Sequence, residues 1–203
     1  MPHKDRLVWL DLEMTGLDPD RHTIVEIATL VTDNQLRVLD GGVGPTLAIA
    51  QTQRAMDSME EWSRKTHTQS GLLAYVTAST ISLEEAETQT LNFIKKFCLP
   101  QQAPLCGNSV GHDRRFLARY MPTLHGYFHY RTVDVSTIKE LVRRWFPHAP
   151  QPQKKRARHR ALDDIQESLA ELIFYRDYYF KRPEHTDPSL PAPPPRPQKN
   201  PQT

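Results

Sequence analysis

The order of apolar and polar positions changes along this chain from short extended runs to helical stripes. Extended runs occupy residues 7–12, 23–32 and 36–41. The second run is rich in β-branched residues, and it is followed by Asp33 and Asn34, a pair typical of a hairpin turn. The pattern therefore predicts a three-stranded meander as the first part of the fold.

Beyond the meander, helical patterns alternate with short apolar runs. The spacing that marks an amphipathic helix occurs at residues 56–65, 82–97, 112–120, 136–146 and 161–180. Residues 104–107 and 130–135 are typical of strands. We expect Ser82 and Ser136 to cap helices and Pro122 to end one. A meander followed by alternating strands and helices predicts an α/β fold, with a mixed five-stranded sheet flanked by helices.

Two segments carry no such pattern. Residues 147–157 are rich in Pro, Gln, Lys and Arg, which is typical of a flexible loop. Residues 183–203 hold 8 of the 17 prolines and almost no core-forming side chains, which predicts a disordered, partly polyproline tail. We therefore expect one domain at residues 1–182, followed by a tail without a defined role.

Composition and charge exclude several classes of protein. The charged fraction of 25%, the hydrophobic fraction of 38% and the formal net charge of +2 are typical of a soluble globular protein. Cys98 and Cys106 form no Cys-x-x-Cys pair, so neither a disulfide framework nor a thiolate zinc site is indicated. No apolar run approaches the roughly 20 residues that cross a bilayer. We therefore expect a cytoplasmic protein that does not bind a membrane.

Two carboxylates interrupt the first apolar run. Asp11 and Glu13 lie two positions apart, so both side chains project from the same face of the predicted strand. Two like charges side by side in a buried strand are costly unless a cation binds between them. The pair therefore predicts a divalent metal site.

Three later residues extend this site. Asp113 lies at a junction of strand and helix, Asp164 lies in the first turn of the last predicted helix, and His159 lies five positions before Asp164. Acids without paired cysteines favour Mg²⁺ or Mn²⁺ over zinc. Four acids and one imidazole predict two-metal hydrolysis of a phosphodiester, in which His159 accepts the proton of the attacking water. An acid in a first helical turn also complements the helix dipole, so this reasoning does not separate Asp163 from Asp164.

Several motifs together resemble one known family. They lie at residues 11–19, 106–116, 130–131, 134–137 and 159–165. In this order they resemble the oligoribonucleases, a family within the DEDDh group of 3′→5′ exonucleases, which have an RNase H-like fold. The resemblance runs from about residue 7 to about residue 180 and leaves out only the tail.

The resemblance implies a role for each matching residue of the site. It implies that Asp11, Glu13, Asp113 and Asp164 bind two Mg²⁺ or Mn²⁺ ions and that His159 is the general base. The family spacing from this histidine selects Asp164 in preference to its neighbour. Oligoribonucleases are similar in acting as homodimers that degrade very short RNA, particularly dinucleotides, to 5′-mononucleotides. No stable protein partner besides the second subunit is expected.

The resemblance also implies which residues hold the RNA. They are Leu17, Trp62, His67, Ser109, Tyr130, Arg131 and Ser136. Leu17 matches a wedge against the bases, and Trp62 matches a stacking ring, which contributes about 1–3 kcal/mol per base. Tyr130, Arg131 and Ser136 match residues that the partner subunit places over the 5′ end, with Tyr130 also in the catalytic set. Without the resemblance, Trp62 and Tyr130 are as well explained by core or interface packing.

Two departures from the family pattern bear on rate and substrate length. His112 stands where the family carries Gln, and residues 154–158 replace a Gly-Thr pair with a basic run. Losing Gly reduces the backbone freedom of the segment before His159, while the added charge attracts RNA or simply faces solvent. Two alternatives to a short-RNA enzyme stay open. One is a DEDDh exonuclease acting on longer RNA or DNA, and the other is a non-catalytic nucleic-acid-binding scaffold.

Overall fold

The architecture is a mixed five-stranded sheet with helices on both faces. The computed structural model describes residues 5–148, 150–152 and 159–180. The strands are β1 (Arg6–Met14), β2 (Ile24–Asp33), β3 (Val38–Ala48), β4 (Leu105–Gly107) and β5 (Thr132–Asp134), in the spatial order β3-β2-β1-β4-β5. β1, β2 and β3 pair antiparallel, whereas β4 and β5 run parallel to β1. The predicted meander and mixed sheet are therefore confirmed, with β1 at the centre.

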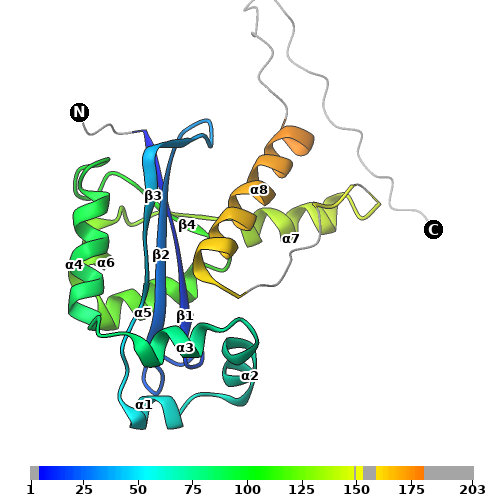
Figure 1. Cartoon of the computed structure of the whole chain (residues 1–203). Coiled ribbons are helices and arrows are strands. Elements are labelled where there is room, and N and C mark those ends of the chain that lie inside the picture. The colour runs from blue at the N-terminus through cyan, green and yellow to red at the C-terminus, as the bar shows by residue number, and fades with distance from the viewer. Residues whose placement is uncertain (1–4, 149, 153–158, 181–203) are drawn as a thin grey trace, which may run out of the picture.

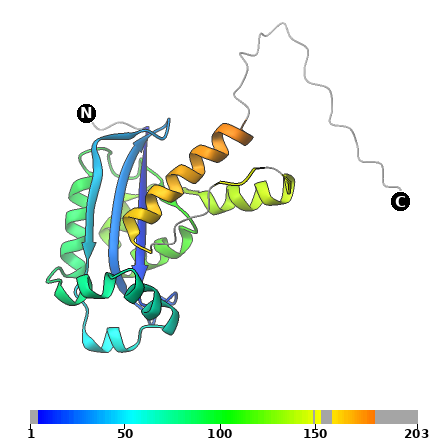
Figure 2. The same ribbon diagram turned by 45° about the vertical axis from the view of Figure 1, so that its right-hand side comes forward.

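The helices form three groups around this sheet (Figures 1 and 2). On one face lie α4 (Leu83–Ile94), α5 (Gly111–Tyr120) and α6 (Pro122–Tyr127). On the opposite face lie α7 (Val135–Trp145) and α8 (Ala161–Tyr179). Beyond one end of the strands lie α1 (Gln53–Asp57), α2 (Glu61–Gln69) and α3 (Leu72–Ala78). The last residues of β1 and the first turn of α8 approach this third group, which is where the candidate site forms.

Alternation along β1 divides its side chains between two cores. Val8, Leu10 and Leu12 are buried against the α4–α6 face. Trp9 points the other way and is fully buried among residues of α7 and α8, including Tyr175. Because side chains alternate along a strand, Asp11 and Glu13 continue the row of Trp9 and face α8. The two apolar faces of the strand therefore fix the direction of its two acids.

Several predicted boundaries are wrong. The third strand extends to Ala48, well past the predicted end at residue 41. The predicted helix at residues 56–65 is two helices, α1 and α2, and α3 was not predicted. Gly71 stands before α3 with a φ of 76°, a backbone conformation that glycine adopts without strain. The errors at the helices fall on α1, α2 and α3, which are short and lie beyond one end of the strands.

Of three predicted helix signals, the cap at Ser136 is wrong, and the helix end at Pro122 and the cap at Ser82 are confirmed. Ser136 is not the cap of α7, because Asp134 is the N-cap and its Oδ1 accepts the Ser136 backbone N–H at 2.9 Å. Pro122 follows the end of α5 but also begins α6, since proline suits a first helical turn. The predicted cap at Ser82 is confirmed as a capping box with Glu85.

Some predictions fall outside the part of the chain that the structure describes. Six of the eleven residues of the predicted loop, 149 and 153–157, and the predicted tail, at residues 183–203, belong to that group. Among the described helices, none is long and apolar enough to span a bilayer.

Candidate active site

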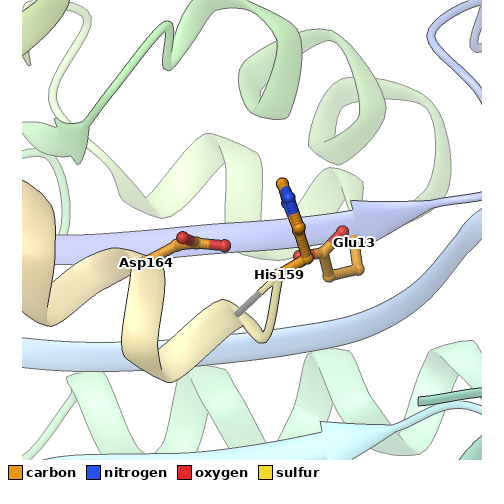
Figure 3. A group of neighbouring side chains, drawn as sticks. All are labelled: Glu13, His159 and Asp164. Carbon is orange, nitrogen blue, oxygen red and sulfur yellow. The ribbon is translucent and has the colours of Figure 1, made fainter. Parts of the chain in front are cut away.

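Three side chains from distant parts of the chain converge at the end of β1 (Figure 3). One donor atom each from Glu13, His159 and Asp164 lies within 4.8 Å of the others. Glu13 is the next-to-last residue of β1, Asp164 lies in the first turn of α8, and His159 lies in the segment just before this helix. In Figure 3, His159 lies between the two acids. Two carboxylates and an imidazole at this separation form a group able to hold a metal ion.

The other two predicted metal-binding acids border this group without belonging to it. Asp11 is half-buried on the same face of β1 as Glu13. Asp113 lies in the first turn of α5, is buried, and accepts a hydrogen bond from the Leu12 backbone N–H at 3.0 Å. Among the described residues, neither joins the 4.8 Å group. Their metal-binding roles therefore stay predictions, although both lie beside the end of β1.

The site brings several buried carboxylates close together, so their negative charges repel one another. The pKa of Glu13 is raised from 4.5 to about 8, first by burial and then by the negative charges of Asp164, Glu26 and Asp113, against the lowering effect of Arg160. Burial likewise raises the pKa of Asp113 to about 7, against the lowering effect of its hydrogen bond from Leu12. A cation would favour the charged forms of these acids. The donor set and its excess negative charge therefore fit a hard divalent ion.

Geometry distinguishes the two adjacent aspartates of α8. Asp164 lies in the group with Glu13 and His159, whereas Asp163 does not, although both are in the first turn. The macrodipole alone could not separate them, because its effect extends over the whole turn. The direction of each side chain around the helix makes the difference.

The candidate RNA-binding residues near this group differ in exposure. Leu17, in the turn after β1, is 56% exposed, and Trp62 of α2 is 64% exposed. The ring of Trp62 lies edge-on to that of His159, with centroids 5.6 Å apart. His67 is buried instead, with Nε2 2.9 Å from the Met14 carbonyl oxygen and Nδ1 3.7 Å from Glu13 Oε2. Burial lowers the pKa of His67, so its ring is neutral near pH 7.

Ser109 and Ser136 meet at the end of β4. The two hydroxyl oxygens are 3.1 Å apart, and the Ser109 backbone N–H donates to Ser136 Oγ at 2.9 Å. Ser136 in turn donates to Asn108 Oδ1, whose amide donates to Ser168 of α8. The structure therefore brings these two predicted residues together.

Tyr130 and Arg131 lie apart from that pair, just before the edge strand β5. The Tyr130 side chain is 72% exposed and packs on His129, with ring centroids 4.4 Å apart. The Arg131 guanidinium lies 5.3 Å from the Tyr130 ring centroid. An exposed aromatic and a cation at a sheet edge are available to a second molecule.

Sequence reasoning missed Glu26 and Arg160. Glu26 is fully buried in β2, directly opposite Glu13, and forms an ion pair with Arg160, the residue after His159. An acid inside an apolar, β-branched run was the available signal, the same one that revealed Asp11 and Glu13.

An acidic site at the end of the central strand of a mixed sheet is the arrangement expected of a metal-dependent nuclease. Comparison with known proteins supports this class. The exonuclease (RNase_T) family model matches residues 8–172. The chain is 53% identical to the oligoribonuclease of Marinobacter nauticus, over 89% of this chain and 99% of the relative. It is 51% identical to the oligoribonuclease of Escherichia coli K12, over 88% of this chain and 98% of the relative. The chain belongs to the exonuclease family and, within it, to the oligoribonucleases.

Solved structures agree on the fold at much lower identity. Exonuclease I in its apo form matches with a TM-score of 0.64 and 11% identity, over 86% of this chain. This chain spans 42% of that protein's length. Schizosaccharomyces pombe Pop2p, in a form with Mg²⁺ and Mn²⁺ bound, matches with a TM-score of 0.61 and 15% identity, over 86% of this chain and 84% of Pop2p. These likenesses confirm the predicted RNase H-like fold.

The family membership confirms the resemblance seen in the motifs and the predicted class of enzyme. The protein is a nuclease that hydrolyses phosphodiester bonds of nucleic acid. The acid and histidine group, in a member of this family, indicates dependence on a divalent metal.

Proposed function

We propose that this protein is a 3′→5′ exoribonuclease that degrades short RNA, especially dinucleotides, to 5′-mononucleotides. The observation that carries the proposal is the convergence of Glu13, His159 and Asp164 in a chain that belongs to the oligoribonucleases. The relatives' name supports short RNA as the substrate class, and their alignment covers nearly their whole length.

Four acids are proposed to hold two Mg²⁺ or Mn²⁺ ions in each active site. They are Asp11, Glu13, Asp113 and Asp164. Their oxygen donors, together with the raised pKa values of Glu13 and Asp113, suit a hard cation, which would stabilise the charge that develops on the phosphate during hydrolysis. The absence of thiolate donors among them disfavours zinc.

His159 is the proposed general base. Its imidazole lies in the same group as the two acids, so a water bound to a metal ion there would be within reach of a ring nitrogen. Trp62, whose ring lies against that imidazole, is proposed to stack on a base of the substrate. Leu17 is proposed as the wedge, while His67, behind Glu13, is proposed to support this side of the pocket.

A homodimer is proposed to complete the substrate pocket. Tyr130 and Arg131 are exposed before an edge strand, which makes them available to the active site of a second subunit. There Arg131 would bind the 5′ end of the RNA in bidentate fashion, and Tyr130 would act beside the catalytic group. Ser109 and Ser136 offer paired hydroxyl groups for the same end. Closure over the 5′ end would restrict the enzyme to very short RNA.

Residues 1–182 are proposed to form the exonuclease domain, which is supported by a family match at residues 8–172. We expect a chain ending at residue 182 to cleave a dinucleotide as fast as the full chain. A cytoplasmic location without a further stable protein partner is proposed as well. Both cysteines are free and buried, as is usual in a reducing compartment.

One assay tests the proposal. A labelled RNA dinucleotide, a longer RNA and single-stranded DNA are each incubated with the protein, with Mg²⁺, with Mn²⁺ and with EDTA. We expect metal-dependent conversion of the dinucleotide to 5′-mononucleotides, abolished by Asp11→Ala. Equal trimming of all three substrates would instead identify a broad DEDDh exonuclease. Binding without metal-dependent cleavage would identify a non-catalytic scaffold.

A further inference from the structure

A buried acid outside the predicted metal set has an unusual arrangement of partners. Glu26 of β2 is fully buried, and it lies directly opposite Glu13 in the β1–β2 register, so both side chains project from the same face. A buried carboxylate is stable only with compensating donors. Arg160 supplies them, with Nε 3.0 Å and Nη2 2.7 Å from Oε1.

The second carboxylate oxygen of Glu26 binds the start of α8. The backbone N–H of Ala161, the first residue of the helix, donates to Glu26 Oε2 at 2.9 Å. This donor is one of the first N–H groups of the helix, which have no partner within the helix. Glu26 therefore holds both the side chain of Arg160 and the backbone that follows it. Both carboxylate oxygens of Glu26 are therefore engaged by donors from the start of α8.

Arg160 is also held on its other side. Its guanidinium carbon lies 4.7 Å from the ring centroid of Tyr75 in α3, the geometry of a cation–π contact. The Arg160 side chain therefore lies between Glu26 of β2 and Tyr75 of α3. Arg160 directly follows His159 in the sequence. Sequence neighbours share a peptide unit, so fixing Arg160 restricts where the backbone of His159 can lie.

His159 itself has a backbone conformation that must be imposed. Its φ is 48°, in the left-handed region that residues other than glycine rarely adopt. Such conformations persist where surrounding contacts determine them. The residue after His159, Arg160, is held by Glu26, and the His159 ring packs against the ring of Trp62.

We propose that the Glu26–Arg160 pair is a positioning device for the general base, holding His159 beside Glu13 and Asp164. Glu26 and Arg160 are positioning residues that act through His159. The inference rests on the proposed function and assigns two further residues to its site. Its alternative is a pair that only fastens α8 to the sheet, which would change stability without a specific effect on the chemical step.

Kinetics of variants separate these two roles. Glu26→Gln removes the charge and keeps similar size, while Arg160→Met keeps the stem and removes the donors. In the dinucleotide assay we expect each of these two variants to lower kcat by about 10-fold to 100-fold with KM little changed. The reason is that the general base His159 is misplaced, whereas the bound RNA is not. The double variant should be no slower than the slower single variant, since both changes break one interaction. Arg160→Lys, which keeps the charge but not the two-pronged geometry, should be intermediate.

A matched control and an epistasis test complete the kinetic set. Asp33→Asn breaks an exposed ion pair, that of Asp33 with Arg37 in the β2–β3 hairpin, and we expect kcat to be unchanged. In a His159→Gln background, Glu26→Gln should have no further effect on kcat. An equal fall in both backgrounds would overturn the proposal, because Glu26 would then act on something other than His159. If Glu26→Gln fails to fold, Tyr75→Leu removes the other contact of Arg160, on a residue that is exposed, and should also lower kcat.

An NMR measurement tests the proposal independently of catalytic activity. The His159 ring lies nearly perpendicular to that of Trp62, with centroids 5.6 Å apart, so we expect its ring protons to carry a ring-current shift that Trp62→Leu removes. We expect Glu26→Gln to reduce this shift and Asp33→Asn to leave it. Retention of the shift in a folded Glu26→Gln protein would overturn the inference. A wild-type protein that shows no metal-dependent cleavage would overturn the proposed function instead, and the two failures are therefore distinguishable.

Discussion

The ring of Trp62 lies edge-on against the imidazole of His159, with the two centroids 5.6 Å apart. Trp62 is also 64% exposed, so its free face is open to a base. We expect Trp62→Ala to lower kcat/KM for a dinucleotide about 10-fold to 100-fold, from loss of the roughly 1–3 kcal/mol of stacking. Trp62→Phe keeps an aromatic face and should retain most of the activity. Equal losses in both variants would argue against stacking.

The first turn of α8 offers a test in which adjacent residues serve as variant and control. Asp164 lies in the group with Glu13 and His159, and Asp163 does not. We expect Asp164→Asn to lower kcat by about 10²-fold to 10³-fold, since several kcal/mol of charge stabilisation are lost. It should also weaken Mn²⁺ binding measured by calorimetry. Asp163→Asn should change both little, and the reverse order would contradict the assignment of Asp164.

The pKa of Glu13 predicts how stability depends on pH without metal. Because the folded-state pKa is raised from 4.5 to about 8, the folded protein binds this proton more tightly than the unfolded chain does. Stability in EDTA should therefore fall as the pH rises from about 4.5 to about 8. Mg²⁺ should reverse this trend, because a cation favours the charged carboxylate. Thermal melts at several pH values measure it.

Glu13→Gln is the control for this pH dependence. It removes one titrating group, so the melting temperature in EDTA should fall less steeply between pH 5 and about pH 8. The raised pKa of Asp113 accounts for a remaining slope in the same direction. A wild-type melting temperature that rises with pH in EDTA would contradict the sign of both shifts.

The dimer proposal predicts complementation between two inactive chains. Asp164→Asn lacks a metal-binding acid, and Arg131→Ala lacks the cation proposed to reach the other subunit. Co-expression should give about a quarter of the wild-type activity, because half of the dimers are mixed and each mixed dimer holds one complete site. Light scattering should give the mass of a dimer. If Arg131 acts within its own chain, co-expression yields no more activity than the two variants alone.

The turn that carries Leu17 depends on the close approach of Gly16 to a buried imidazole. A Cβ on Gly16 would lie 2.6 Å from the ring of His22, whose Nδ1 accepts the Asp18 backbone N–H at 3.1 Å. We expect Gly16→Ala to lower the free energy of unfolding by about 1–3 kcal/mol and to raise KM by displacing Leu17. Gly126→Ala, where a Cβ meets nothing within 4 Å, should not destabilise the fold. Urea titration and dinucleotide kinetics check both effects.

Local patterns in the sequence determined much of the fold and the acids at its centre. Asp11 and Glu13 share a face because side chains alternate along any strand, whatever packs against it. The capping box of Ser82 and Glu85 and the apolar stripe of α8 are likewise encoded by residues within a few positions of each other. Such patterns are readable because their causes are local.

Tertiary structure decided what depends on residues far apart in the chain. Glu26 and Arg160 are separated by 134 positions, and only the β1–β2 register and the approach of α8 bring them together. The family spacing selects Asp164 over Asp163, but the physical cause is the rotation of α8 about its axis, which packing against the sheet sets. The sequence alone therefore predicted which groups could do chemistry, and the three-dimensional contacts decided which of them meet and what holds them there.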